Sequence, residues 1–177
     1  GDIIRGNGRG NIRFLMPRGR DFMMYGDYTI ERGDYLFTLY NVVNKDFSIK
    51  RGGKITWDGD PFGARIRLEA SYKDLKASVS NFIQEYLGGV DSGLKNEASK
   101  ATDVELTLQL EGELLRPLIN FDVEFPSLTG QLQTYTDNKL RLLKQNQDEL
   151  NRQVFGLIVV GQFLPSGLAF NGGTLLY

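Results

Sequence analysis

A mostly β fold with a helical C-terminal part is predicted by one change in the hydrophobic pattern. Up to residue 126, apolar and polar residues alternate as in strands with one buried and one solvated face. From Thr129 the apolar residues recur at steps of three and four, as on one face of a helix. A length of 177 residues suits one domain with its own core. We therefore expect a single domain, 1–177, with a β meander at 1–126, an amphipathic helical segment at 129–164 and a tail at 165–177.

The predicted strands differ in how cleanly they alternate. The clearest runs are 64–72, 104–111 and 119–125, and looser runs cover 12–16, 28–30, 35–39 and 47–57. Such spacing is typical of an antiparallel meander. Between the runs we expect turns, because Gly, Asn, Asp and Pro favour them, at Gly26-Asp27, Gly33-Asp34, Asn44-Lys45, Gly52-Gly53, Asp58 to Pro61 and Gly112.

The second half of the chain gives weaker boundaries. Residues 73–87 fit both periods, and we expect a strand followed by a turn, whereas the polar run 88–102 predicts a long exposed loop. In the helical segment, Asp137 or Asp148 is the expected N-cap, and residues 145–148 are expected to divide it into two helices. Pro165 is the expected helix end, with one more strand in the tail.

Composition removes most catalytic chemistry. The chain has no His and no Cys, which excludes the Ser-His-Asp and Cys-His mechanisms, disulfides and the usual zinc sites. We therefore expect no enzyme, no metal and no cofactor. A net charge of −1 gives no basic excess for binding nucleic acid. The longest apolar stretch, 154–160, is too short to span a membrane. Because the chain begins inside a predicted strand without an initiator Met, we expect a fragment of a longer chain, with any membrane anchor upstream.

Four smaller features each have a plain and a functional interpretation. Gly6 to Gly10 predicts a turn or bulge rather than a phosphate loop, because no helix follows it. Asp58-Gly59-Asp60 predicts a turn rather than a cation site. The carboxylates of the alternating strands face outward, with no sign of a catalytic pair. A basic bias in the first twenty residues suits a solvated strand face, with contact to lipid headgroups or a partner as the alternative; it consists of Arg5, Arg9, Arg13, Arg18 and Arg20.

The alternating strands leave open what covers their apolar face. About fifteen large side chains share it, and burial of each stabilises by roughly 1.5 to 3 kcal/mol, so water is excluded as a permanent neighbour. A second sheet, the amphipathic helical segment or an apolar ligand could each cover it.

Three stretches resemble one family in the right order. The run ITWDGDP at 55–61, continued by ASY at 70–72, resembles the I-x-W-x-G-D-P … A-x-Y signature of the TamB-type C-terminal domain. The run LQLEGEL at 108–114, with Pro117, Phe121 and Pro126 after it, is similar to that family's L-x-G-x-L stretch. The run DELNRQVFGLIV at 148–159 resembles its E-L-N-R-Q-V-F helix, in a Bacteroidota-like form. The resemblance extends over residues 1–165.

The resemblance implies a curled antiparallel sheet, like a taco shell, whose apolar concave groove takes phospholipid acyl chains. It also implies a periplasmic envelope protein, anchored in the inner membrane through a segment outside this chain, that meets an outer-membrane barrel of the BamA/TamA type. Lipid transport between the membranes and outer-membrane protein assembly are the implied functions. The implied groove lining is Trp57, Ile66, Leu68, Tyr72, Leu106, Leu108, Leu110, Phe121, Val123 and Phe125.

Two other kinds of protein fit parts of the pattern. A small outer-membrane β-barrel suits the length, the alternation and the terminal aromatic residue, although the helical segment argues against it. A protein-binding β-sandwich with no lipid role suits the alternation alone.

Overall fold

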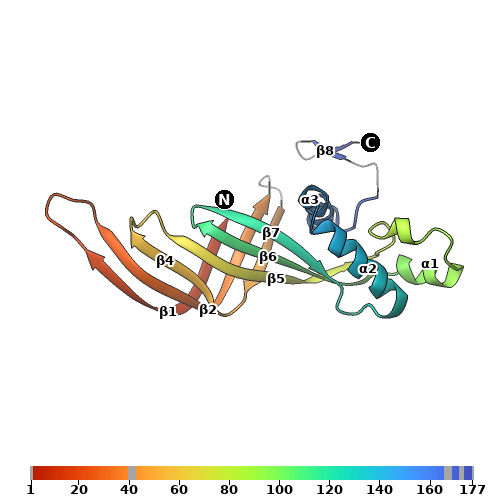
Figure 1. Cartoon of the computed structure of the whole chain (residues 1–177), viewed down its shortest axis with the longest axis horizontal. Coiled ribbons are helices and arrows are strands. Elements are labelled where there is room, and N and C mark those ends of the chain that lie inside the picture. The colour runs from red at the N-terminus through yellow and green to blue at the C-terminus, as the bar shows by residue number, and fades with distance from the viewer. Residues whose placement is uncertain (1, 40–42, 166–168, 172–173, 177) are drawn as a thin grey trace. The chain divides into compact units, whose positions relative to one another are not determined.

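The computed structural model describes residues 2–39, 43–165, 169–171 and 174–176. It contains mostly antiparallel β-sheet with helices towards the C-terminus, as predicted (Figure 1). The strands are β1 (Ile3–Leu15), β2 (Met23–Leu39), β3 (Val43–Ile49), β4 (Gly53–Gly59), β5 (Arg65–Ala77), β6 (Thr102–Glu113), β7 (Arg116–Glu124), β8 (Ala169–Asn171) and β9 (Thr174–Leu176). The helical elements are η1 (Gln84–Tyr86), α1 (Ser92–Ser99), α2 (Gly130–Leu143), α3 (Gln147–Phe155) and η2 (Gly156–Val160).

The main sheet is open. Its strand order is β1-β2-β3-β5-β6-β7, with β4 paired to both β2 and β5, and β1 and β7 end the path in the described part of the chain. A closed barrel has no such ends. The sheet is therefore curled but not closed, and the outer-membrane barrel alternative is wrong.

Strands β3 and β4 lie end to end between β2 and β5 and together form one row of the sheet. Residues 33–39 of β2 pair with β3, and residues 24–30 of β2 pair with β4. On the other side, β3 and β4 pair with successive parts of β5. Residues 50–52 interrupt the row, where Gly52 N–H donates to the Ile30 carbonyl (2.9 Å) and Lys50 N–H donates to the Glu69 carbonyl (2.8 Å). The two strands thus continue one another across a short bulge.

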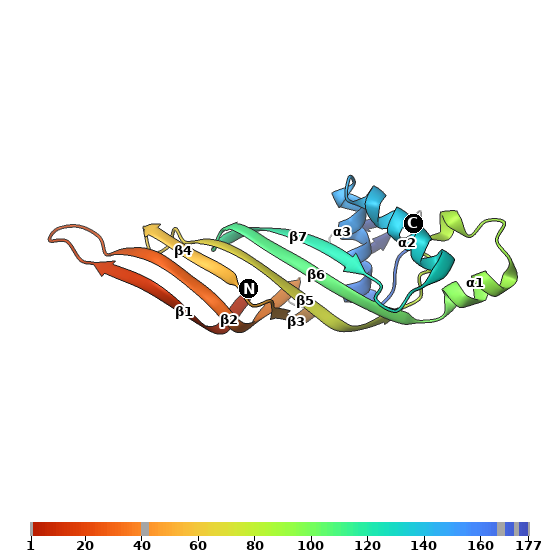
Figure 2. The ribbon, with the colours of Figure 1, turned by 60° about the horizontal axis from the view of Figure 1, so that its bottom comes forward.

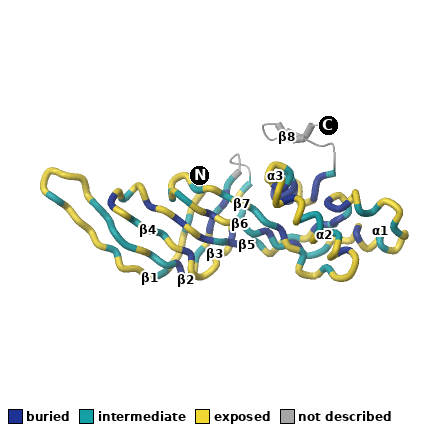
Figure 3. Tube along the Cα trace, in the orientation of Figure 1, coloured by how far each residue is buried: buried dark blue, intermediate teal, exposed yellow. Residues whose placement is uncertain are grey.

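The chain forms two compact units. The strand unit comprises 1–72 and 107–120, and the helical unit comprises 73–106 and 121–177. Strands alone supply the regular structure of the strand unit within the described residues. Its apolar sheet face is nevertheless buried within the curled sheet. Figure 3 shows these buried positions along the strands; they are Ile30, Tyr35, Phe37, Phe47, Ile49, Ala64, Ile66, Leu68, Ala70, Leu108 and Leu110.

In the helical unit, helices cover the sheet. A shallow cleft is lined by Asp122 to Glu124 of β7 and by Asp137 and Leu140 of α2, which places this helix against that strand (Figure 2). The apolar stripe predicted from Thr129 onward is buried at most of its positions. The buried helical side chains include Leu132, Leu143, Leu150, Val154, Leu157 and Ile158.

Several predicted turns are wrong because they lie inside strands. Gly26-Asp27 and Gly33-Asp34 belong to β2, and Asn44-Lys45 belongs to β3. Gly26 has φ +131°, and a Cβ there would come within 1.9 Å of the Asn11 carbonyl oxygen, so glycine permits the close approach of two strands rather than a reversal. The predicted bulge in Gly6 to Gly10 is confirmed, because the β1–β2 register shifts between Asn7 and Gly8.

The helix boundaries also needed correction. The division near residues 145–148 is confirmed, but Asn146 is the N-cap of α3, accepting from Glu149 N–H at 3.2 Å. The predicted loop at 88–102 contains α1, capped by Asp91. The helical run ends at Gly161, with φ +78°, before Pro165. The predicted last strand of the tail corresponds to β8 and β9, and residues 166–168, 172–173 and 177 lie outside the described part.

Candidate functional site: the apolar face of the sheet

The predicted lining residues of the strand unit form one packed cluster. Ile66 and Leu68 of β5 and Leu108 and Leu110 of β6 project from the same face of adjacent strands. Their exposed fractions lie between 0% and 4%. The alternating pattern predicted correctly that these residues share one face. In this structure, other side chains of the protein surround them instead of solvent.

Trp57 and Tyr72 stand half-buried beside this cluster. The Trp57 indole Nε1–H donates to the Pro61 carbonyl at 3.1 Å, which fixes the ring next to the turn that ends β4. The Tyr72 ring contacts Phe47, with 5.8 Å between ring centroids, and the Lys45 ammonium lies 5.4 Å from the centroid of the same ring. These two aromatic rings are the predicted lining residues of the strand unit that remain partly accessible.

The predicted lining residues of the helical unit contact that unit's own core. Leu106 and Val123 are buried, and Phe121 and Phe125 are half-buried. Phe125 belongs to an aromatic cluster with Phe82 and Phe163, whose centroids lie 4.6–5.6 Å apart. Phe163, which follows the helices in the sequence, therefore occupies the position next to Phe125.

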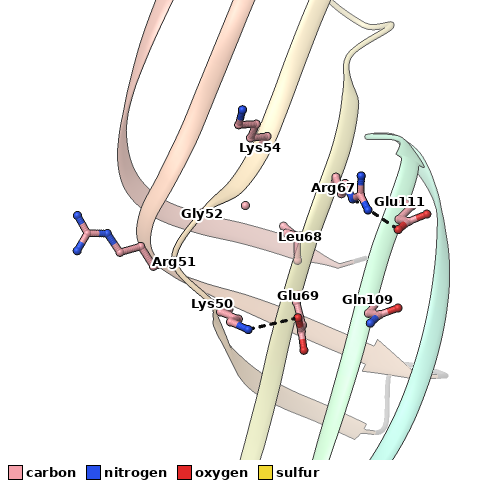
Figure 4. A pocket seen from close by; sticks show the side chains of 10 residues that line it. Lys50, Arg51, Gly52, Lys54, Arg67, Leu68, Glu69, Gln109 and Glu111 are labelled. Atoms are coloured by element: carbon pink, nitrogen blue, oxygen red, sulfur yellow. Dashed lines mark ion pairs between the residues drawn. The ribbon is translucent and has the colours of Figure 1, made fainter.

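The opposite face of the strand unit is polar and carries a cleft of about 390 Å³ at the bulge. Figure 4 shows its charged rim, where Lys50 pairs with Glu69 and Arg67 pairs with Glu111, each at 3.8 Å. These pairs are exposed, and pairs of this kind contribute little to stability. Each carboxylate already faces a cation, and no group of three metal-ligating side chains occurs among the described residues. This cleft has the character of a solvated strand face.

The polar residues of the 148–159 motif have a role that the sequence analysis missed. Arg152 donates to both carboxylate oxygens of Glu149, at 2.7 and 2.8 Å, and its remaining guanidinium nitrogen donates to the Pro165 carbonyl at 3.2 Å. Gln153, only 2% exposed, donates to the Leu164 carbonyl (3.0 Å) and accepts from Leu164 N–H (2.9 Å). The motif thus binds the chain that follows the helices back onto α3.

This network shifts the pKa of its carboxylate. The hydrogen bonds from Arg152 hold the pKa of Glu149 below its ordinary value of 4.5, and they outweigh partial burial, which acts in the opposite direction. Spacing alone signalled the Glu149–Arg152 contact, because residues three apart on a helix are neighbours. Nothing in the sequence indicated residues 164 and 165 as partners.

Tyr35 is a second residue that the sequence analysis did not single out. Its ring lies in the strand-unit core, and its hydroxyl donates to the Asp2 carboxylate, which also accepts from Thr38 N–H at 2.9 Å. Burial, reinforced by this carboxylate, raises the pKa of Tyr35. The contact provides a buried phenol with the partner it requires.

Comparison with known families decides the classification. The family model of the TamB C-terminal domain matches residues 1–176. The chain belongs to the TamB C-terminal domain family. TamB proteins are non-enzymatic components of envelope assembly and transport, and they work with outer-membrane assembly partners. No curated protein and no solved structure gives a significant match to the chain.

The TamB assignment confirms the resemblance carried by the three motifs. It supports an association with the cell envelope. In the described residues, every helix is too short or too polar to cross a bilayer.

Proposed function

We propose that this TamB-type domain provides an apolar sheet face along which phospholipid acyl chains pass between the inner and outer membranes. The observation that carries the proposal is a row of apolar side chains on adjacent strands of a curled, open sheet, in a chain that matches the TamB family over 1–176. Each acyl methylene removed from water gains about 0.8 kcal/mol, and a row of similar side chains holds a tail with little preference for any one position.

The burial of the row adds a condition to the proposal. Leu108 and Leu110 have no exposed surface. An acyl chain therefore reaches them only when the sheet uncurls and lipid contacts replace side-chain contacts. Trp57 and Tyr72 are the expected first contacts, since both rings are still partly accessible. Charge chemistry is not needed along this path, and no catalytic residue is invoked.

The proposed partners follow from the family. We place the domain in the periplasm, held by an inner-membrane segment outside this chain, and working with an outer-membrane barrel of the BamA/TamA type. A second candidate is assembly of outer-membrane proteins without lipid uptake. The near-complete burial of Ile66, Leu68, Leu108 and Leu110 favours it.

Site-specific photo-crosslinking tests the first proposal. The photoreactive residue benzoylphenylalanine replaces Trp57, whose half-buried ring it resembles, and as a matched control it replaces Thr56, the exposed neighbour on the opposite strand face. After irradiation in cells, mass spectrometry of the purified protein is expected to show a phospholipid adduct at position 57 and none at position 56. No adduct at either position would contradict acyl contact with this face and favour the assembly role, and equal adducts at both positions would contradict a lipid path confined to this face.

A further inference from the structure

The β1–β2 hairpin ends in a tip that exposes apolar side chains. We define the hairpin tip as residues 13–24, the end of β1, the turn and the start of β2 (Figures 1 and 3). Phe14 is 59% exposed and Met16 is 78% exposed, and Leu15 and Phe22 are exposed as well. All three methionines of the chain lie in this tip. The tip therefore gathers several exposed apolar side chains within one short segment of the chain.

The exposed side chains form an ordered group. The rings of Phe14 and Phe22 stack across the hairpin, with 5.6 Å between centroids and 17° between planes. Between them, Arg20 N–H donates to the Pro17 carbonyl and Gly19 adopts φ +71°, which closes the turn. Phe62, also exposed, lines the neighbouring cleft together with Phe22. Contiguous exposed apolar groups of this kind mark an interaction site, whereas single exposed leucines are ordinary.

The charged residues of the hairpin tip indicate what kind of partner it would bind. The hairpin tip contains Arg13, Arg18 and Arg20 against one acid, Asp21, and none of these arginines forms a side-chain ion pair within the described residues. Arg13 lies over the Tyr25 ring at 5.3 Å, leaving Arg18 and Arg20 at the turn itself. Asp58 of β4 and Asp60, which follows that strand, line the same cleft as Phe62 and Arg20. Apolar side chains interleaved with unpaired guanidinium groups match the acyl and phosphate layers of an anionic bilayer surface.

We propose that the hairpin tip inserts into the interface of a bilayer that contains anionic phospholipid. Phe14, Leu15, Met16 and Phe22 occupy the acyl boundary, while Arg18 and Arg20 contact phosphates. Methionine suits this position because its flexible side chain adapts to a fluid surface. The inference uses none of the residues of the proposed acyl path, so each can fail without the other.

Vesicle binding by the 177-residue chain tests the inference. Because the chain lacks cysteine, Met16→Cys can be labelled at one position with an environment-sensitive NBD dye. Leu118→Cys is the matched control, since Leu118 is 70% exposed but lies on β7, outside the tip. With phosphatidylglycerol-containing vesicles we expect brighter, blue-shifted emission at position 16, quenched by spin-labelled acyl chains, and no change at position 118.

Two further variants separate the apolar and the charged contributions, measured by co-sedimentation with the same vesicles. Phe14→Ser with Met16→Ser is expected to weaken binding roughly tenfold or more. Arg18→Gln with Arg20→Gln is expected to weaken it about fivefold per arginine, and added salt removes this difference. Both pairs are exposed, so circular dichroism should report unchanged folding.

Three outcomes would overturn the inference. One is no binding to vesicles by the unmodified chain, and another is the same dye response at positions 16 and 118. The third is a response at position 16 that rises with protein concentration in the absence of vesicles, because that would assign the tip to contact with a second copy of the chain.

Discussion

Leu108 illustrates how a single position on the sheet determines the cost of a charge. Its side chain has no exposed surface, whereas the next residue, Gln109, faces solvent. A carboxylate at position 108 would lose its hydration without gaining a partner. We expect Leu108→Asp to lower the free energy of unfolding by at least about 4 kcal/mol. Gln109→Asp should cost about 1 kcal/mol, from the poor strand propensity of Asp.

Urea unfolding of both Leu108→Asp and Gln109→Asp measures this difference. Similar costs for the two variants would mean that the face of Leu108 is open to water, which the structure contradicts. The same measurement therefore reports whether the apolar row is closed in solution when no lipid is present.

Glu149 gives the protein a pH-dependent contact. Its folded-state pKa is lowered, so its contribution to stability is fully present above the ordinary glutamate value of 4.5 and is lost as the pH falls through the lower folded value. We expect Glu149→Gln to be less stable than the unmodified chain at neutral pH, with the gap narrowing below pH 4.5. Urea midpoints across this range check it, with the exposed Glu113→Gln as control. A gap that stays constant with pH would contradict the ion-pair origin.

At the scale of elements, glycine in β2 sets how closely the hairpin strands approach. Gly26 combines φ +131° with a Cβ position that overlaps the Asn11 carbonyl oxygen. We expect Gly26→Ala to destabilise the chain by at least about 2 kcal/mol. Gly88→Ala is the control, because a Cβ there meets no atom within 4 Å, and its effect should stay within about 0.5 kcal/mol. Thermal unfolding of the two variants measures both effects. Equal changes in melting temperature would show that the close approach of the two strands is not the cause of the destabilisation.

The elements also show which sequence signals were reliable. Period-2 alternation predicted β5, β6 and β7, because their side chains stand on one packed and one solvated face. Pairs of a glycine and an acidic residue were wrongly predicted to form turns. In β2 they lie inside one long strand, where the chain does not reverse. Helix α1 was missed because its single buried residue, Ala98, leaves no apolar period to detect.

At the scale of the whole molecule, the two units are expected to unfold together as one domain. The unit boundaries fall inside β5, β6 and β7, so each unit depends on strands that continue into the other. Trp57, the only tryptophan, reports on the strand unit, while the described helices all belong to the helical unit. We expect tryptophan fluorescence and far-ultraviolet circular dichroism to give coincident urea transitions. Separate midpoints would show two independent domains.

The candidate site was predicted only in part. Alternation together with the family motifs placed Ile66, Leu68, Leu108 and Leu110 on one face, because a period of two fixes the face of every residue in a strand. It could not show whether this face is open, since closure depends on how far the sheet curls over itself. The helix motif likewise predicted α3 but not its contacts with Leu164 and Pro165, which are set by the return of the chain.

The bulge at residues 50–52 preserves side-chain parity along the row of β3 and β4. Inward positions on both sides of it are odd-numbered: Phe47 and Ile49 before it, Gly53, Ile55 and Trp57 after it. Three intervening residues keep the two strands in phase although their ladder is interrupted. Loss or gain of one residue here would turn the Trp57 ring outward and the Lys54 ammonium inward, whereas a change by two would leave both in place. An odd change would need a compensating irregularity, such as the one in β2, where the inward positions switch from the even-numbered Ile30 to the odd-numbered Tyr35 opposite this bulge.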